Sequence, residues 1–131
     1  MKYAEKHFTL ELLEKINNNE TALTDLMERL LVKNKPFFAK KGLDFHAEFE
    51  RKGNDPFDPG YHSSISLAIC DENDNLLDLN MITIWECDRY FLGLPVSKKI
   101  PGSKIAGELL DESPKDIKVE LNEYINEQLS L

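Results

Sequence analysis

Alternating apolar and polar positions in the middle of the chain predict a β-hairpin at residues 63–88. In the first half of this segment, Ile65, Leu67 and Ile69 occupy every second position, the spacing of a strand with one buried face. In the second half, the same spacing joins five residues that we expect on one inward face: Leu77, Leu79, Met81, Thr83 and Trp85. Between the two halves, the Asp and Asn residues at positions 71–75 favour a turn.

The register of this hairpin follows from keeping both apolar sets on one face of the sheet. Side chains alternate between the two faces of a strand, so a shift by one residue would turn one apolar set toward solvent. We therefore expect Ile69 to pair with Leu77, and Leu67 to pair with Leu79.

Apolar residues three and four positions apart predict helices on both sides of the hairpin. The N-terminal part is expected to form a helix pair, with one helix at residues 9–17 and another at residues 20–33. The second helix must end before Pro36, whose ring would clash with the preceding turn. Toward the C-terminus, Ser113 and Pro114 have the residue types of a helix start, and an apolar stripe follows them.

Two further segments have strand patterns. Residues 43–51 alternate inward apolar side chains with an outward row that we expect to face solvent. The members of that row are Asp44, His46, Glu48 and Glu50. Residues 90–96 include Pro95, which suits an edge strand because proline cannot donate a ladder hydrogen bond.

Together these elements predict a single α+β domain over residues 1–131. Its centre is an antiparallel sheet of three to four strands in meander order, packed by an N-terminal helix pair and a C-terminal helix. The composition agrees with a folded domain, because 41% hydrophobic and 31% charged residues are ordinary values for one.

The negative charge is concentrated in the sheet region. The formal net charge is −8, and residues 43–88 hold eleven acidic residues but only two basic ones. The remaining segments are nearly neutral, with 13 acidic and 14 basic residues. Such a region repels nucleic acid, whose phosphates require basic contacts, and attracts a basic protein.

The sequence lacks the features of several other protein classes. No apolar run reaches the length of a membrane-spanning helix, so we expect no membrane contact. The first residues are charged and amphipathic without an apolar signal core, which indicates a cytoplasmic protein with reduced Cys70 and Cys87. Because the histidines lack metal-binding spacing, neither a metal nor another cofactor is expected.

Two functions fit these patterns. The first is a small protein-binding module, an inhibitor or immunity-type protein that presents the acidic sheet face to a basic partner. The loop at residues 53–62, with Asp55 and Asp58, would belong to that surface. The alternative is a small-molecule-binding protein or enzyme with a pocket near Trp85 and His62, although no nucleophile motif favours catalysis. That pocket requires five side chains to converge: His46, Tyr61, His62, Trp85 and Glu86.

Self-association into a homodimer is compatible with either function. The outward row of the first hairpin strand consists of small residues, which would let another layer approach closely. These residues are Ser64, Ser66, Ala68 and Cys70.

Overall fold

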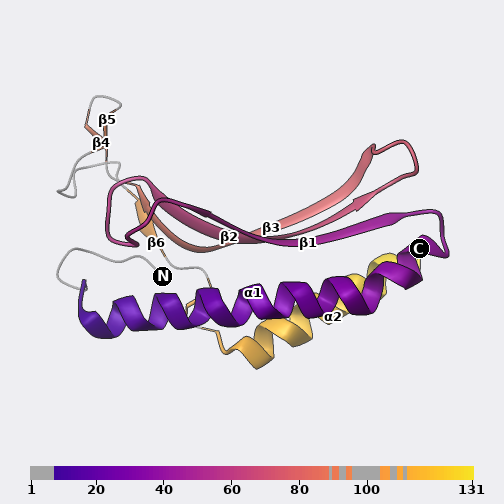
Figure 1. The fold of residues 1–131 in the computed structure, drawn as a ribbon, viewed down its shortest axis with the longest axis horizontal. Coiled ribbons are helices and arrows are strands. Elements are labelled where there is room, and N and C mark those ends of the chain that lie inside the picture. The colour runs from indigo at the N-terminus through magenta and orange to yellow at the C-terminus, as the bar shows by residue number, and fades with distance from the viewer. Residues whose placement is uncertain (1–7, 89, 92–93, 96–103, 107–108, 111) are drawn as a thin grey trace.

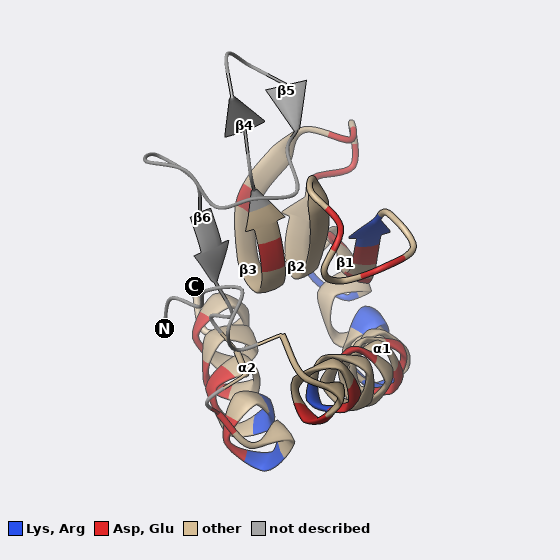
Figure 2. Ribbon diagram, turned by 90° about the vertical axis from the view of Figure 1, so that its left-hand side faces the viewer, with Lys and Arg blue, Asp and Glu red and all other residues tan. Residues whose placement is uncertain are grey.

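A curved antiparallel sheet and two helices form the two layers of the protein, seen in a computed structural model (Figure 1). The structure describes residues 8–88, 90–91, 94–95, 104–106, 109–110 and 112–131. Helices α1 (Leu10–Ala39) and α2 (Pro114–Leu129) lie side by side against one face of the sheet (Figure 2). The predicted α+β class is confirmed, and no described helix covers the other face of the sheet.

The N-terminal part forms one long helix, so the prediction of an N-terminal helix pair is wrong. Helix α1 extends over 30 residues and runs through the consecutive asparagines without a break. Its buried residues continue across that point, since Ile16, Asn19, Glu20 and Leu23 are all buried. Packing of this continuous face outweighs the low helix propensity of asparagine, so the helix does not end there.

The start of α1 follows the capping rules, but Pro36 does not stop it. The Thr9 hydroxyl accepts a hydrogen bond from the Leu12 amide at 3.2 Å, which satisfies one free donor of the first turn. The helix continues through Pro36 into one more turn, so the prediction that it ends before this residue is wrong. Burial of Phe38, which stacks on Phe45 with ring centroids 4.8 Å apart, stabilises that last turn.

The main sheet has the strand order β1–β2–β3–β6, and its first three strands form the predicted antiparallel meander. Their bounds are Asp44–Lys52, Tyr61–Cys70 and Leu76–Asp88. The fourth strand, β6 (Lys104–Ala106), pairs with β3. The edge strand predicted at residues 90–96 is replaced by β4 (Tyr90–Phe91) and β5 (Leu94–Pro95), which pair with each other in a separate sheet. Positions 92, 93 and 96 of that prediction lie outside the described residues.

The observed register of β2 with β3 differs by one residue from the predicted register, so that prediction is wrong. The observed pairs are Ile69–Asp78 and Leu67–Asn80, in place of Ile69–Leu77 and Leu67–Leu79. The cause is an irregularity beside the turn. Cys70 pairs with Leu76, so β3 contains one extra residue before the regular ladder begins.

This shift turns the leucines of β3 away from the helix layer. Leu77, Leu79 and Met81, which we predicted to face inward, are exposed. Asp78 instead faces the helices, where its carboxylate accepts a hydrogen bond from the Tyr124 hydroxyl of α2. A polar residue at an inward position is tolerated because it has a hydrogen-bond partner there.

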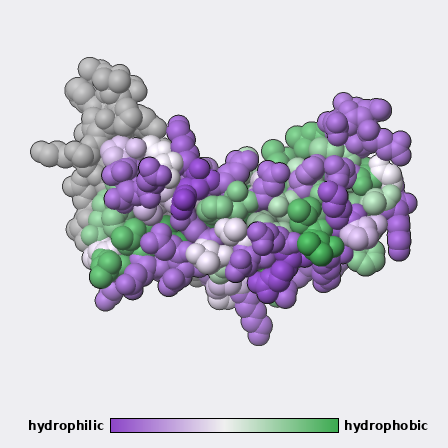
Figure 3. Space-filling view, viewed as in Figure 1, coloured by the Kyte–Doolittle hydropathy of each residue, from purple (hydrophilic) through white to green (hydrophobic). Residues whose placement is uncertain are grey.

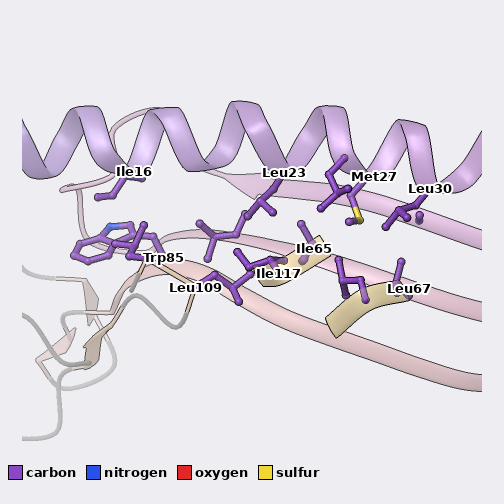
Figure 4. Close-up of a cluster of buried hydrophobic side chains, with 14 of the residues drawn as sticks. Ile16, Leu23, Met27, Leu30, Ile65, Leu67, Trp85, Leu109 and Ile117 are labelled. Atoms are coloured by element: carbon purple, nitrogen blue, oxygen red, sulfur yellow. The ribbon is translucent and has the colours of Figure 1, made fainter. Parts of the chain in front are cut away.

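The core lies between the sheet and the two helices (Figure 4). Trp85 is fully buried, and its indole Nε1 donates a hydrogen bond to the Pro56 carbonyl at 2.6 Å. Phe57 stacks on Phe8 at 4.3 Å, and both rings meet the indole edge-on at 6.3 Å. Figure 4 labels the central residues: Ile16, Leu23, Met27, Leu30, Ile65, Leu67, Trp85, Leu109 and Ile117.

Helix α2 confirms the predicted C-terminal helix. The Ser113 hydroxyl accepts a hydrogen bond from the Asp116 amide at 3.1 Å, and Pro114 is the first helical residue. The buried residues of α2 are Ile117, Leu121 and Ile125. Neither described helix is both long and apolar enough to cross a membrane.

Candidate functional site

The sheet face turned away from α1 and α2, called the outer face below, carries three parallel rows of side chains. Cross-strand pairing places them side by side: Glu48, Ser66 and Met81 form one rung, and His46, Ala68 and Leu79 form the next. The acidic row on β1 contains Asp44, His46, Glu48 and Glu50. The small row on β2 contains Ser66, Ala68 and Cys70, whereas Ser64, predicted in the same row, is buried. The apolar row on β3 contains Leu76, Leu77, Leu79 and Met81.

All members of the apolar row are large and about half exposed, between 48 and 56% of their surface. Figure 3 shows apolar side chains at the surface beside the polar tip of the β2–β3 hairpin. Leu77, Leu79 and Met81 alternate along β3, and Leu76 pairs with Cys70 of the small row beside the irregularity, so these residues form one contiguous patch on the outer face. Contiguous exposed apolar patches mark sites where another molecule binds.

The acidic row combines partnered and free charges. Asp44 lies 3.0 Å from His46 Nε2 and 3.8 Å from Lys35 Nζ, so this end of the row is partly neutralised. Glu48 and Glu50 are exposed, and neither has an ion-pair partner among the described residues. They are therefore the two carboxylates of the row that are available to an incoming cation.

The small row on β2 lies between the acidic row on β1 and the apolar row on β3. Neighbouring strands lie about 4.8 Å apart, so the acidic and apolar rows are separated by about 10 Å. The side chains of Ser66 and Ala68 are shorter than those on either flank. An occupant of the outer face can therefore approach the backbone of β2 most closely and touch both flanking rows.

The loop between β1 and β2 is held by its own hydrogen bonds. Asp55 Oδ1 accepts from the Phe57 amide at 2.9 Å, and its backbone carbonyl accepts from the Asp58 amide at 3.0 Å. The Gly60 amide donates to the Cys87 carbonyl at 2.8 Å, which ties the loop to β3. Asp55 and Asp58, both predicted as binding residues, are exposed on this tethered loop.

The five side chains predicted to line a pocket lie on two faces of the sheet. Tyr61 and Trp85 are buried in the core, whereas the adjacent residues His62 and Glu86 form a cross-strand pair on the outer face. His46 pairs with Ala68, which is six residues along β2 from His62, or about 20 Å. The described structure therefore does not gather these five side chains around one cavity.

A buried carboxylate–phenol pair that was not predicted from the sequence connects α1 to β2. Glu20 is only 5% exposed, and its two carboxylate oxygens lie 2.6 and 2.9 Å from the Tyr61 hydroxyl, which donates to them. Burial and the adjacent carboxylate raise the pKa of Tyr61, because both disfavour a phenolate. The signal was available, since Glu20 lies between Ile16 and Leu23 on the apolar stripe of α1.

The remaining chemistry of the described residues is limited. No three His, Cys, Asp or Glu side chains of the described part lie close enough together to hold a metal ion. Cys70 is half-buried in the small row and Cys87 is buried, and neither of them forms a disulfide. Comparisons with protein-family models, with curated proteins and with solved structures found no match for the chain. Its function is therefore inferred from the chemistry of the outer face.

Proposed function

We propose that the protein is a small binding module, of the inhibitor or immunity type, whose outer face binds a basic partner protein. One observation carries this proposal: a contiguous apolar row lies uncovered on the same sheet face as the two free carboxylates of the acidic row. The apolar row supplies the surface to be buried, and the carboxylates select a partner of positive charge.

The size of a stable interface links the two rows. A specific protein complex buries about 800 Å² on each partner. An area of that size extends beyond a single strand, and the acidic row begins only about 10 Å from the apolar row. A partner that covers Leu79 and Met81 in such an interface therefore also faces Glu48 and Glu50.

Charge favours a basic protein over a second copy of this chain. The formal net charge of −8 means that two copies repel each other, and at physiological salt this repulsion acts mainly within a Debye length of about 8 Å. A basic partner gains from the same field, because complementary charge speeds encounter. Binding should therefore weaken as salt rises.

The test is capture from a lysate of the source organism with three immobilised baits. They are the wild type, the outer-face variant Glu48→Lys/Glu50→Lys, and the control Glu120→Lys/Glu123→Lys. The control makes the same change in net charge on exposed positions of α2, on the opposite side of the protein.

A basic protein captured by the wild type and the control, lost with the outer-face variant and released by high salt, is the expected result. Capture that is equal for all three baits, or no capture by any of them, would contradict the proposal. Folding of each bait is verified beforehand by circular dichroism.

A further inference from the structure

We infer that the occupant of the outer face is an amphipathic helix that lies along β2, with its apolar side on the β3 row and a basic side on the β1 row. This inference rests on the proposed function, and it specifies the shape of the partner. Three observations carry it: the width of the face, the spacing along the strands, and the short side chains in the middle.

The width of the face matches a helix. An α-helix with its side chains is about 10–12 Å across. The apolar and acidic rows are about 10 Å apart with β2 between them. A helix centred over β2 therefore reaches both rows, whereas one extended segment, about 4.8 Å wide, covers only one of them.

The spacing along the strands also matches. Side chains two residues apart on β1, such as Glu48 and Glu50, are separated by about 6.8 Å. Residues four apart on a helix are separated by about 6.0 Å along its axis. Two basic residues at positions i and i+4 of the partner would thus face the two free carboxylates, and leucines with the same spacing would face Leu79 and Met81.

The middle of the face is low enough for such a helix to sit between the flanking rows. Ser66 and Ala68 occupy the two central rungs, where a larger side chain would hold a helix away from the sheet. The other face of the same sheet is already covered by α1 and α2. An incoming helix would therefore add a third layer and cover the apolar row.

Two labelled peptides of equal composition, made of leucine, alanine and lysine, test this inference. One has about 14 residues in a helical pattern, which spans the about 20 Å of the acidic row, with a leucine stripe beside a lysine stripe. The other has the same residues, with apolar residues and lysines alternating in the pattern of a strand. Binding is measured by fluorescence anisotropy against the wild type, Leu79→Glu and the control Val119→Glu. Leu79 and Val119 are matched, because they are 48 and 50% exposed.

The helical peptide should bind the wild type and Val119→Glu alike. Its affinity for Leu79→Glu should fall by about tenfold, because an apolar contact is replaced by a charge. The strand-patterned peptide should bind more weakly. The helical peptide should also gain helical circular dichroism when it binds.

Other outcomes distinguish a failure of the helix inference from a failure of the basic-partner proposal. Equal or tighter binding of the strand-patterned peptide, still lost with Leu79→Glu, would refute the helix and leave the basic-partner proposal intact. If either peptide binds Leu79→Glu as tightly as it binds the wild type, or if neither peptide binds, both the helix inference and the basic-partner proposal would be overturned. A molar mass of two copies by light scattering, reduced to one by Leu79→Glu, would identify the occupant as a second copy of this chain.

Discussion

The orientation of β3 determines whether the outer face is a binding surface, and a pair of leucine truncations tests it directly. Leu67 of β2 is 1% exposed and lies in the core, whereas Leu79 of β3 is 48% exposed on the outer face. The predicted register would have paired these two residues with both side chains inward. We therefore compare Leu67→Ala with Leu79→Ala.

The structure gives clearly different costs for the two changes. Truncating a fully buried leucine removes its transfer free energy and leaves a cavity, which together cost about 2–5 kcal/mol. Full burial of a leucine contributes about 1.5–3 kcal/mol, and Leu79 is only about half buried. Solvent fills the space that its truncation leaves, so no cavity term is added. Leu79→Ala should therefore cost about 1 kcal/mol.

The assay is urea unfolding followed by tryptophan fluorescence. The chain has a single tryptophan, Trp85, which is fully buried against two aromatic rings and reports loss of the core. The comparison is valid where the dependence on denaturant is unchanged between variants. A cost of 2 kcal/mol or more for Leu79→Ala, similar to that of Leu67→Ala, would refute the observed register and remove the apolar row.

Three further predictions concern single hydrogen bonds: one between β2 and α1, one between β3 and the β1–β2 loop, and one in the cap of α2. Tyr61→Phe should cost about 1–3 kcal/mol, because the buried Glu20 carboxylate loses its hydrogen-bond donor, while the double variant with Glu20→Leu should cost less than Tyr61→Phe alone. The raised pKa of Tyr61 adds stability that is fully present below the unfolded tyrosine pKa of about 10. Above that pH, urea unfolding should show the wild type losing its advantage over Tyr61→Phe, by up to about 1.4 kcal/mol per pH unit. Trp85→Phe should lower the melting temperature, because it removes the donor to the Pro56 carbonyl and leaves a cavity. Ser113→Ala should cost about 1 kcal/mol in chemical denaturation through loss of the α2 cap, and Ser113→Asp should restore most of it.

Local patterns predicted the elements of the sheet better than their arrangement. The meander of β1, β2 and β3 followed from alternation and turn residues, and α2 followed from its cap and stripe. The acidic row was also predicted on the outward face of β1 from alternation alone. These features depend on short-range chemistry that is visible within a few residues.

The break predicted within α1 was wrong because local propensity was given too much weight. Three asparagines disfavour a helix, but Asn19 and Glu20 lie on the buried face, and their neighbours pack on the sheet. A charged residue on an apolar stripe was the clue to a distant partner. Tyr61 is that partner, 41 residues away, and no local pattern could identify it.

The register of β3 could not be obtained from alternation, because alternation allows either face of the strand to point inward. Leu77, Leu79 and Met81 occupy one face, and Asp78 and Asn80 occupy the other, so apolar burial favours the first set inward. The extra residue beside the turn reverses that choice. The partner that makes the reversed choice tolerable, Tyr124 of α2, lies far away in the sequence.

The inward placement of Asp78 bears on why the leucines face out. An inward carboxylate without a partner would destabilise the observed β2–β3 register relative to a register shifted by one residue. The hydrogen bond from Tyr124 offsets that cost. Burial and the adjacent carboxylate also raise the pKa of Tyr124. Departures from the local burial rule that are supported elsewhere in the fold concentrate at functional sites. The exposed leucines are thus held outward by a specific contact on the opposite face of the same strand, as expected if their function is to bind a partner.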